Sequence, residues 1–98
     1  MAQFDVYRVG DNAFVLDCQS DSLSHLATRV VTPLMRAREV PAAASRLHPV
    51  FTFNGEAFLL AAHLLTAIAT RDLGSPVASL DAERYRILTA LDVLIRGV

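Results

Sequence analysis

Three histidines are the side chains of this 98-residue chain best suited to hold a metal ion. His25, His48 and His63 lie far apart in the sequence, without the close pair of ligands that is typical of a zinc site. The spacing therefore predicts no metal site, and no other motif indicates a cofactor.

The single cysteine is the next candidate for chemistry. Cys18 could act as a nucleophile only with a base beside it and in an electropositive setting. Its neighbours in residues 13–18 are mostly apolar and indicate a strand, so we expect a buried structural thiol. One cysteine also cannot form a disulfide within the chain, which fits a reducing compartment.

Two pairs of carboxylates could supply an acid and a base. Asp81 and Glu83 stand at the start of an expected helix, where capping and the helix dipole account for them. Asp17 and Asp21 flank the end of a strand, and a hydrogen bond within a turn is the simplest role for Asp21. Neither pair indicates an assembled active site.

Arginines could bind phosphate groups, and Arg36, Arg38 and Arg46 lie close together in the sequence. The chain carries 9 basic and 10 acidic side chains, so it lacks the excess positive charge of a nucleic-acid-binding protein. We therefore expect these arginines to form a solvated face. The sequence also contains no glycine-rich phosphate loop and no serine-hydrolase motif. Together these observations favour a protein that acts by binding.

The elements that must position these residues are predicted to be mostly strands. Alternating or β-branched runs indicate strands at residues 4–8, 13–18, 28–34, 50–53, 56–60 and 77–79. Asn54 and Gly55 tolerate the positive φ angles of a type I′ turn, so the runs on either side of them should form a tight hairpin. Pro33 lacks an amide donor and should lie at an edge or a bulge.

The remaining segments are predicted to connect and cover the sheet. Residues 35–47 should be a connection with a helical turn or an edge strand, and residues 61–69 a short helix packed on the sheet. A final helix should begin with Asp81 as its N-cap, with Leu80 and Tyr85 as a hydrophobic staple. Its apolar stripe consists of Ile87, Leu88, Leu91, Leu94 and Ile95.

The end of this helix carries apolar residues and no charged tail. Leu91 and Leu94 should reach the core, whereas Val98 could lie in the core or form an exposed contact. The whole pattern predicts a single domain over residues 1–98, with a mainly antiparallel sheet and a C-terminal helix in an α+β or small-barrel arrangement.

Composition sets further expectations. Apolar residue types make up 53% of the chain, which is enough for a core without disulfides or metal. The longest uncharged apolar stretch, residues 57–70, is too short to span a bilayer, and the opening residues contain no secretion signal. We therefore expect a cytoplasmic protein.

Six blocks of sequence resemble the CcdB family, the toxins of a class of bacterial toxin–antitoxin modules. The blocks are QFDVY at 3–7, FVLDCQSD at 14–21, RVVTPL at 29–34, LHPVF at 47–51, NGEAF at 54–58 and GSPVASL at 74–80. They follow the order of the family and, with the terminal helix, cover nearly the whole chain. The resemblance implies a homodimer of SH3-like barrels, each with a small extra sheet and a C-terminal helix.

The resemblance also implies a function. CcdB proteins are not enzymes and use no cofactor; they bind the A subunit of DNA gyrase and trap this topoisomerase while its DNA is cleaved. A disordered segment of the CcdA antitoxin neutralises the toxin, and the complex of the two represses its own operator. The implied partners are therefore a second copy, gyrase and a CcdA-like antitoxin, with operator DNA bound only through the antitoxin complex.

The gyrase contact of the family centres on a C-terminal Trp-Gly-Ile, which corresponds to Arg96, Gly97 and Val98 in this sequence. Further contact positions of the family correspond to Ser22, Leu23, Asp92 and Ile95. Gly97 matches the motif, whereas Arg96 replaces its aromatic anchor, and the chain contains no tryptophan. Ser22 replaces an apolar residue of the family.

Two other functions stay open at this point. Arg96 also fits a non-toxic or retargeted relative that serves as the binding partner or corepressor of an antitoxin. MazF-like toxins share the fold and cleave single-stranded RNA, a role for which Arg29 with Thr28 or Thr32 could be proposed. The near-neutral charge argues against RNA cleavage, because affinity for RNA is largely electrostatic.

Overall fold

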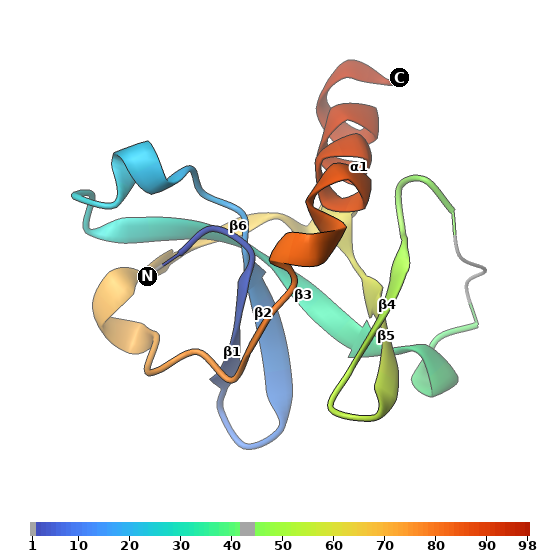
Figure 1. Cartoon of the computed structure of the whole chain (residues 1–98), viewed down its shortest axis with the longest axis horizontal. Coiled ribbons are helices and arrows are strands. Elements are labelled where there is room, and N and C mark those ends of the chain that lie inside the picture. The colour runs from blue at the N-terminus through green and yellow to red at the C-terminus, as the bar shows by residue number, and fades with distance from the viewer. Residues whose placement is uncertain (1, 42–44) are drawn as a thin grey trace.

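The computed structural model describes residues 2–41 and 45–98 (Figure 1). Its strands are β1 Asp5–Val9, β2 Ala13–Asp17, β3 Thr28–Arg36, β4 Val50–Phe53, β5 Glu56–Leu60, β6 Thr66–Ala69 and β7 Ala78–Ser79. All strand pairs in this described part are antiparallel, in the order β4-β5-β3-β2-β1-β7, with β6 also paired to β3. The helix α1 spans Arg84–Arg96. The predicted antiparallel sheet with a C-terminal helix is confirmed.

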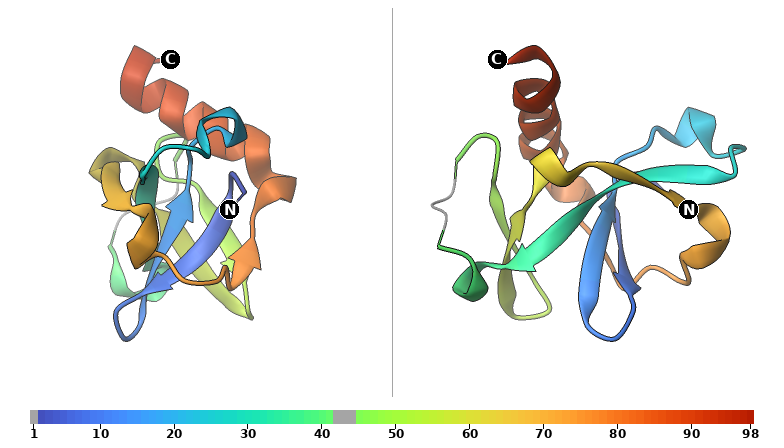
Figure 2. Two further views of the ribbon diagram at one scale, coloured as in Figure 1. Left: turned by 90° about the vertical axis from the view of Figure 1, so that its left-hand side faces the viewer. Right: turned by 180° about the vertical axis from the view of Figure 1, so that it is seen from behind.

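The long strand β3 joins the two halves of the sheet. One edge of β3 pairs with β2, and the other pairs with β6 over residues 28–31 and with β5 over residues 34–36. This branching curls the sheet into a nearly closed barrel (Figures 1 and 2).

Pro33 lies where β3 changes from one partner to the other. The prediction of an edge or a bulge is wrong, because β3 is central in the sheet and its register with β2 runs through Pro33 without a break. The Pro33 carbonyl accepts a hydrogen bond of 2.9 Å from the Ala61 amide, so the nitrogen of Pro33 faces the same gap between β5 and β6. The missing amide proton of Pro33 therefore costs no hydrogen bond to a neighbouring strand.

The hairpin of β4 and β5 has the predicted bounds. Asn54 and Gly55 connect the strands with φ angles of 52° and 77°, as a type I′ turn requires. Behind the turn, the rings of Phe53 and Phe58 stack with their centroids 4.3 Å apart, and Phe14 of β2 packs edge-on against both. The aromatic contacts therefore hold the hairpin against the rest of the barrel.

The predicted helix over residues 61–69 is wrong. The chain makes one 3-10 turn, η3 at Ala62–Leu64, and then forms β6. β6 pairs with β3 from Thr28↔Ala69 to Val31↔Thr66, and so supplies partners to backbone groups of β3 that β5 does not reach. Alanine favours a helix, so the pairing with this edge of β3 overrides the local preference of the segment.

Residues 35–47 match the predicted connection in part. β3 continues to Arg36, and a 3-10 turn, η2 at Ala37–Glu39, follows it. Residues 42–44 of the predicted connection lie outside the described residues.

The helix starts differently from the prediction. A 3-10 turn, η5 at Asp81–Glu83, precedes α1, and neither element has a side-chain hydrogen bond at its N-cap. Asp81 therefore does not cap the helix; its carboxylate lies 3.4 Å from the guanidinium of Arg84. The staple is also wrong, because Leu80 is buried whereas Tyr85 is 79% exposed. The 3-10 entry changes the pitch, so the spacing of an α-helix does not hold there.

The core lies on both faces of the sheet. Along β1, Val6 belongs to the main cluster beneath α1, and its neighbour Tyr7 belongs to a second cluster on the opposite face. From α1, Ile87 and Ala90 are fully buried in the main cluster, and Leu91 packs at its margin. The first half and the middle of α1 therefore anchor the helix to the core of the barrel. None of the helices in the described part of the chain is long and apolar enough to cross a membrane.

Candidate partner-binding surface

The last turn of α1 leaves the barrel and points into solvent (Figures 1 and 2). Ile95 is 72% exposed and Val98 59% exposed, although both are apolar. Arg96 and Asp92 are exposed as well. Of the two positions kept open for Val98, the structure shows the exposed one.

Gly97 ends the helix and sets the direction of this tail. Its φ of 79° is in the left-handed region, and its amide donates a hydrogen bond of 3.0 Å to the Val93 carbonyl. Leu94, one turn back, is half-buried, so the predicted core contact is only partial there. The apolar stripe thus continues from the core into solvent.

The second group of predicted contact residues lies on a short turn, η1, at Asp21–Leu23. Ser20 caps this turn, since its hydroxyl accepts a hydrogen bond of 3.2 Å from the Ser22 amide. Leu23 is 43% exposed. In Figures 1 and 2, η1 and the end of α1 occupy separate places, so one chain does not bring Ser22 and Leu23 beside the tail.

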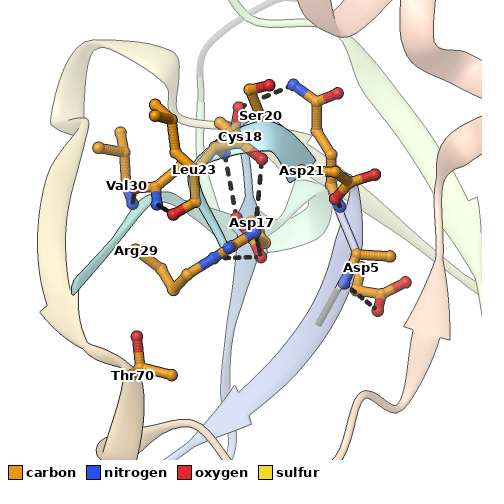
Figure 3. A network of polar contacts seen from close by, with 12 residues as sticks. Asp5, Asp17, Cys18, Ser20, Asp21, Leu23, Arg29, Val30 and Thr70 are labelled. Carbon is orange, nitrogen blue, oxygen red and sulfur yellow. Dashed lines mark hydrogen bonds and ion pairs between the residues drawn. The ribbon is translucent and has the colours of Figure 1, made fainter. Parts of the chain in front are cut away.

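A buried ion pair lies beneath η1 (Figure 3). Arg29 Nε and Nη2 lie 2.9 and 2.6 Å from Asp17 Oδ2, and both side chains are 0% exposed. The other carboxylate oxygen, Oδ1, accepts a hydrogen bond from the Gln19 amide. The side chain of Gln19 donates to the Leu23 carbonyl and accepts from the Val30 amide. The pair therefore positions the backbone that leads into η1.

This network was not predicted from the sequence. A hydrogen bond within its own turn was expected for Asp21, but Asp21 Oδ1 accepts one of 2.7 Å from the Gln3 amide, eighteen residues away. For Arg29, only a catalytic role was considered. The available signal was the alternation in β3, where Arg29 shares its sheet face with the buried Val31.

Cys18 is a buried thiol, as predicted. Burial raises the pKa of the Cys18 thiol to about 11, an effect that the hydrogen bond with Thr32 partly offsets. Burial likewise raises the pKa of Tyr7, with the nearby carboxylates of Asp5 and Asp17 adding to the shift. Both groups are therefore neutral at physiological pH, and Cys18 lacks the thiolate that a nucleophile needs.

The three arginines predicted to form a solvated face have different roles. Arg38 is exposed and lies 3.6 Å from Glu56. Arg36, with a side chain only 15% exposed, pairs with Glu56 and bonds to Asn12, so the prediction is wrong for this residue. Its guanidinium packs over the rings of Phe14 on β2 and Phe58 on β5, which explains its burial. Arg46 is exposed.

Other parts of the surface were not expected from the sequence. A pocket of about 410 Å³ is lined by Ser45, Arg46, Pro49, Tyr85, Arg86 and Thr89. The pocket contains none of the predicted contact residues.

Two histidines also lie close together at the surface. His48 Nε2 lies 2.8 Å from His63 Nδ1. Within the described residues, no group of three or more His, Cys, Asp or Glu side chains is placed to hold a metal ion.

The structure belongs to the class of small antiparallel barrels with a C-terminal helix, and in the described residues the end of that helix exposes apolar side chains while the Asp17–Arg29 pair is buried. Among solved structures, it is similar to an endoribonuclease in complex with its cognate antitoxin from mycobacterial species. The TM-score is 0.78 and the identity 15%, over 98% of this chain and 95% of that one, so the likeness shows the fold.

The particular family follows from the sequence profile. The CcdB protein family matches residues 3–97, and the chain therefore belongs to the CcdB family of toxins from toxin–antitoxin systems. A comparison with curated proteins found no match. The expected family membership is confirmed.

Proposed function

We propose that this protein is a gyrase-binding toxin that acts by capture and not by catalysis. The end of α1 contacts the A subunit of gyrase and stabilises the complex in which DNA is cleaved. The contact residues are Asp92, Ile95, Arg96, Gly97 and Val98, joined by Ser22 and Leu23 on η1. The observation that carries the proposal is the exposure of Ile95 in the last turn of α1 and of Val98 just beyond it.

An apolar helix end in water is costly unless a partner covers it. Ile95 lies one turn beyond Leu91, which packs on the core, so the backbone that carries Ile95 is already ordered. An ordered contact loses less conformational entropy on binding than a flexible tail does. This arrangement favours a preformed binding element.

Arg96 changes the chemistry expected of the partner. A guanidinium can stack on an aromatic ring or form a bidentate pair with a carboxylate, but it does not fill an apolar pocket as an indole does. The gyrase that fits this chain therefore presents an acidic or aromatic side chain opposite Arg96.

The proposal includes a homodimer in the cytoplasm. In one chain, η1 and the end of α1 lie apart. A dimer would therefore present two helix ends and two copies of η1 to one gyrase molecule. The partner that neutralises the toxin is a CcdA-like antitoxin, and the complex of the two represses its operator. The structural neighbour bound to its own antitoxin supports partnering of this kind.

RNA cleavage is the less favoured function. Arg29 and Thr32 are both 0% exposed, and the guanidinium of Arg29 is paired with Asp17. Contact with an RNA phosphate would require breaking a buried ion pair, which costs several kcal/mol. Only Thr28 of the residues considered for catalysis is exposed.

The test is a cleavage assay with gyrase from the host, ATP and plasmid DNA. The wild-type protein should produce protein-linked linear DNA, and deletion of Gly97 and Val98 should abolish it. Val77→Ala changes an exposed apolar residue outside the proposed site and serves as the matched control. Absence of linear DNA with a folded wild-type protein would refute gyrase poisoning, and cleavage of a single-stranded RNA in parallel would favour the ribonuclease.

Arg96 supports one alternative, a non-toxic relative that only binds an antitoxin and acts as its corepressor. In that case the wild-type protein gives no linear DNA but still binds the antitoxin. Arg96→Trp should then restore poisoning, because a tryptophan anchor can contribute about 2 kcal/mol or more to an interface.

A further inference from the structure

Two histidines that are distant in the sequence meet at the surface of the folded chain. His48 Nε2 lies 2.8 Å from His63 Nδ1, the ring centroids are 4.8 Å apart, and the ring planes are inclined at 75°. Neither residue belongs to the proposed gyrase contact. We propose that His48 and His63 form a binding site for a divalent late transition-metal ion, with a preference for Cu²⁺ and Ni²⁺.

The distance between the two nitrogen atoms lets a single ion bind both after small ring rotations. At metal–nitrogen distances of about 2.0 Å, two ligands of one ion are about 2.8 Å apart at right angles and about 3.3 Å apart in a tetrahedral site. Cu²⁺ and Ni²⁺ accept square-planar or tetragonal nitrogen ligands, and Cu²⁺ ranks highest in affinity among divalent first-row metals.

The protonation chemistry of the pair permits this binding. Without metal, one of the two facing nitrogens donates its proton to the other. With metal, both lone pairs face the ion, so that proton moves to the outer nitrogen of its ring through exchange with solvent, and the rings turn toward the metal. His63 is exposed and His48 half-buried, so water reaches the pair and can fill the remaining coordination positions.

The backbone on both sides of the pair is held in place. Ser45 and His48 are joined by two hydrogen bonds, from the Ser45 amide to the His48 carbonyl and from the His48 amide to the Ser45 hydroxyl. His63 lies on η3, which begins directly after Ala61, and the Ala61 amide donates a hydrogen bond to the Pro33 carbonyl. Metal binding therefore needs only ring rotations and no folding of the backbone.

The site has two protein ligands, so its affinity should be moderate and below that of a structural zinc site. The test is isothermal titration of the full chain, freed of metal, with CuCl₂ and NiCl₂ in a buffer that does not chelate them. The wild-type protein should bind one ion per chain. His63→Ala and His48→Gln should each weaken binding at least about tenfold, since each removes one of the two ligands.

His25→Ala is the matched control, because His25 is an exposed histidine on the separate segment between η1 and β3. Ni²⁺ should raise the melting temperature of the wild type and of His25→Ala, but not that of His63→Ala. His63 is exposed, so its replacement should leave the fold intact, which circular dichroism verifies. Undetectable binding to the wild type, equal binding by His63→Ala, or loss of binding in His25→Ala would each overturn the proposal.

Discussion

Arg29 binds a single carboxylate oxygen of Asp17 through both Nε and Nη2, and neither side chain reaches solvent. Two charges in a low-dielectric interior are tolerated only as a pair. The Asp17 carboxylate also accepts a hydrogen bond from the Gln19 amide, and the Gln19 side chain donates one to the Leu23 carbonyl. The ion pair thus connects the inside of the barrel to the turn that presents Ser22 and Leu23.

Breaking this pair should be strongly destabilising. Asp17→Asn leaves the guanidinium of Arg29 buried without a counter-charge, and we expect a loss of about 3–5 kcal/mol in the free energy of unfolding. Urea denaturation monitored by circular dichroism measures the change. Asp81→Asn, which removes the exposed pair with Arg84, is the control and should cost less than about 1 kcal/mol. Equal effects of the two replacements would contradict the assigned role of Asp17.

Two isoleucines on α1 should respond oppositely to the same replacement. Ile87 is fully buried, so Ile87→Ala should lower the free energy of unfolding by about 2–5 kcal/mol. Ile95 is 72% exposed, so Ile95→Ala should change stability by less than about 0.5 kcal/mol. If Ile95 contacts gyrase, its replacement should still reduce the yield of linear DNA. If the Ile95→Ala protein poisons gyrase as fully as the wild type, Ile95 is not part of the contact surface.

The left-handed conformation of Gly97 should be required for the direction of the tail. Gly97→Ala meets no atom within 4 Å, so the only cost is backbone strain of about 1 kcal/mol or more at φ 79°. We expect the tail to leave this conformation and gyrase poisoning to fall. Gly97→Asn is the matched comparison, because asparagine tolerates the left-handed region, and it should retain more activity. The opposite order of the two variants would contradict this explanation.

Cys18 should make stability depend on pH in alkaline solution. Folding raises the pKa of its thiol from 9.0 to about 11, so the folded state holds the proton more tightly than the unfolded state does. This contribution is complete below pH 9 and is lost as the pH rises through about 11, for a total of roughly 3 kcal/mol.

The measurement is urea denaturation at several pH values between 8 and 11, with Cys18→Ala as the comparison. Tyr7, whose pKa is also raised, contributes in the same direction to both proteins, so the difference between them isolates the thiol. Cys18 should also resist alkylation at pH 8 until the chain is unfolded. Rapid alkylation of the native protein would show that the thiol is accessible.

The sequence by itself determined the features that depend on neighbouring residues. Asn54 and Gly55 define a turn that few other pairs allow, so the bounds of β4 and β5 were predicted correctly. Alternation placed β1 and β2, and the run of apolar neighbours correctly predicted a buried Cys18. The ordered blocks over most of the chain identified the family.

Only the tertiary structure decided the features that depend on distant partners. β6 forms because β3 has an edge that β5 leaves unpaired, and Arg29 can be buried because its guanidinium pairs with Asp17. His48 and His63 meet because the end of β5 lies beside the segment before β4. Local patterns predict neighbours that a tight turn joins, as in the hairpin of β4 and β5, but they do not specify which segments distant in the sequence pair when the barrel closes.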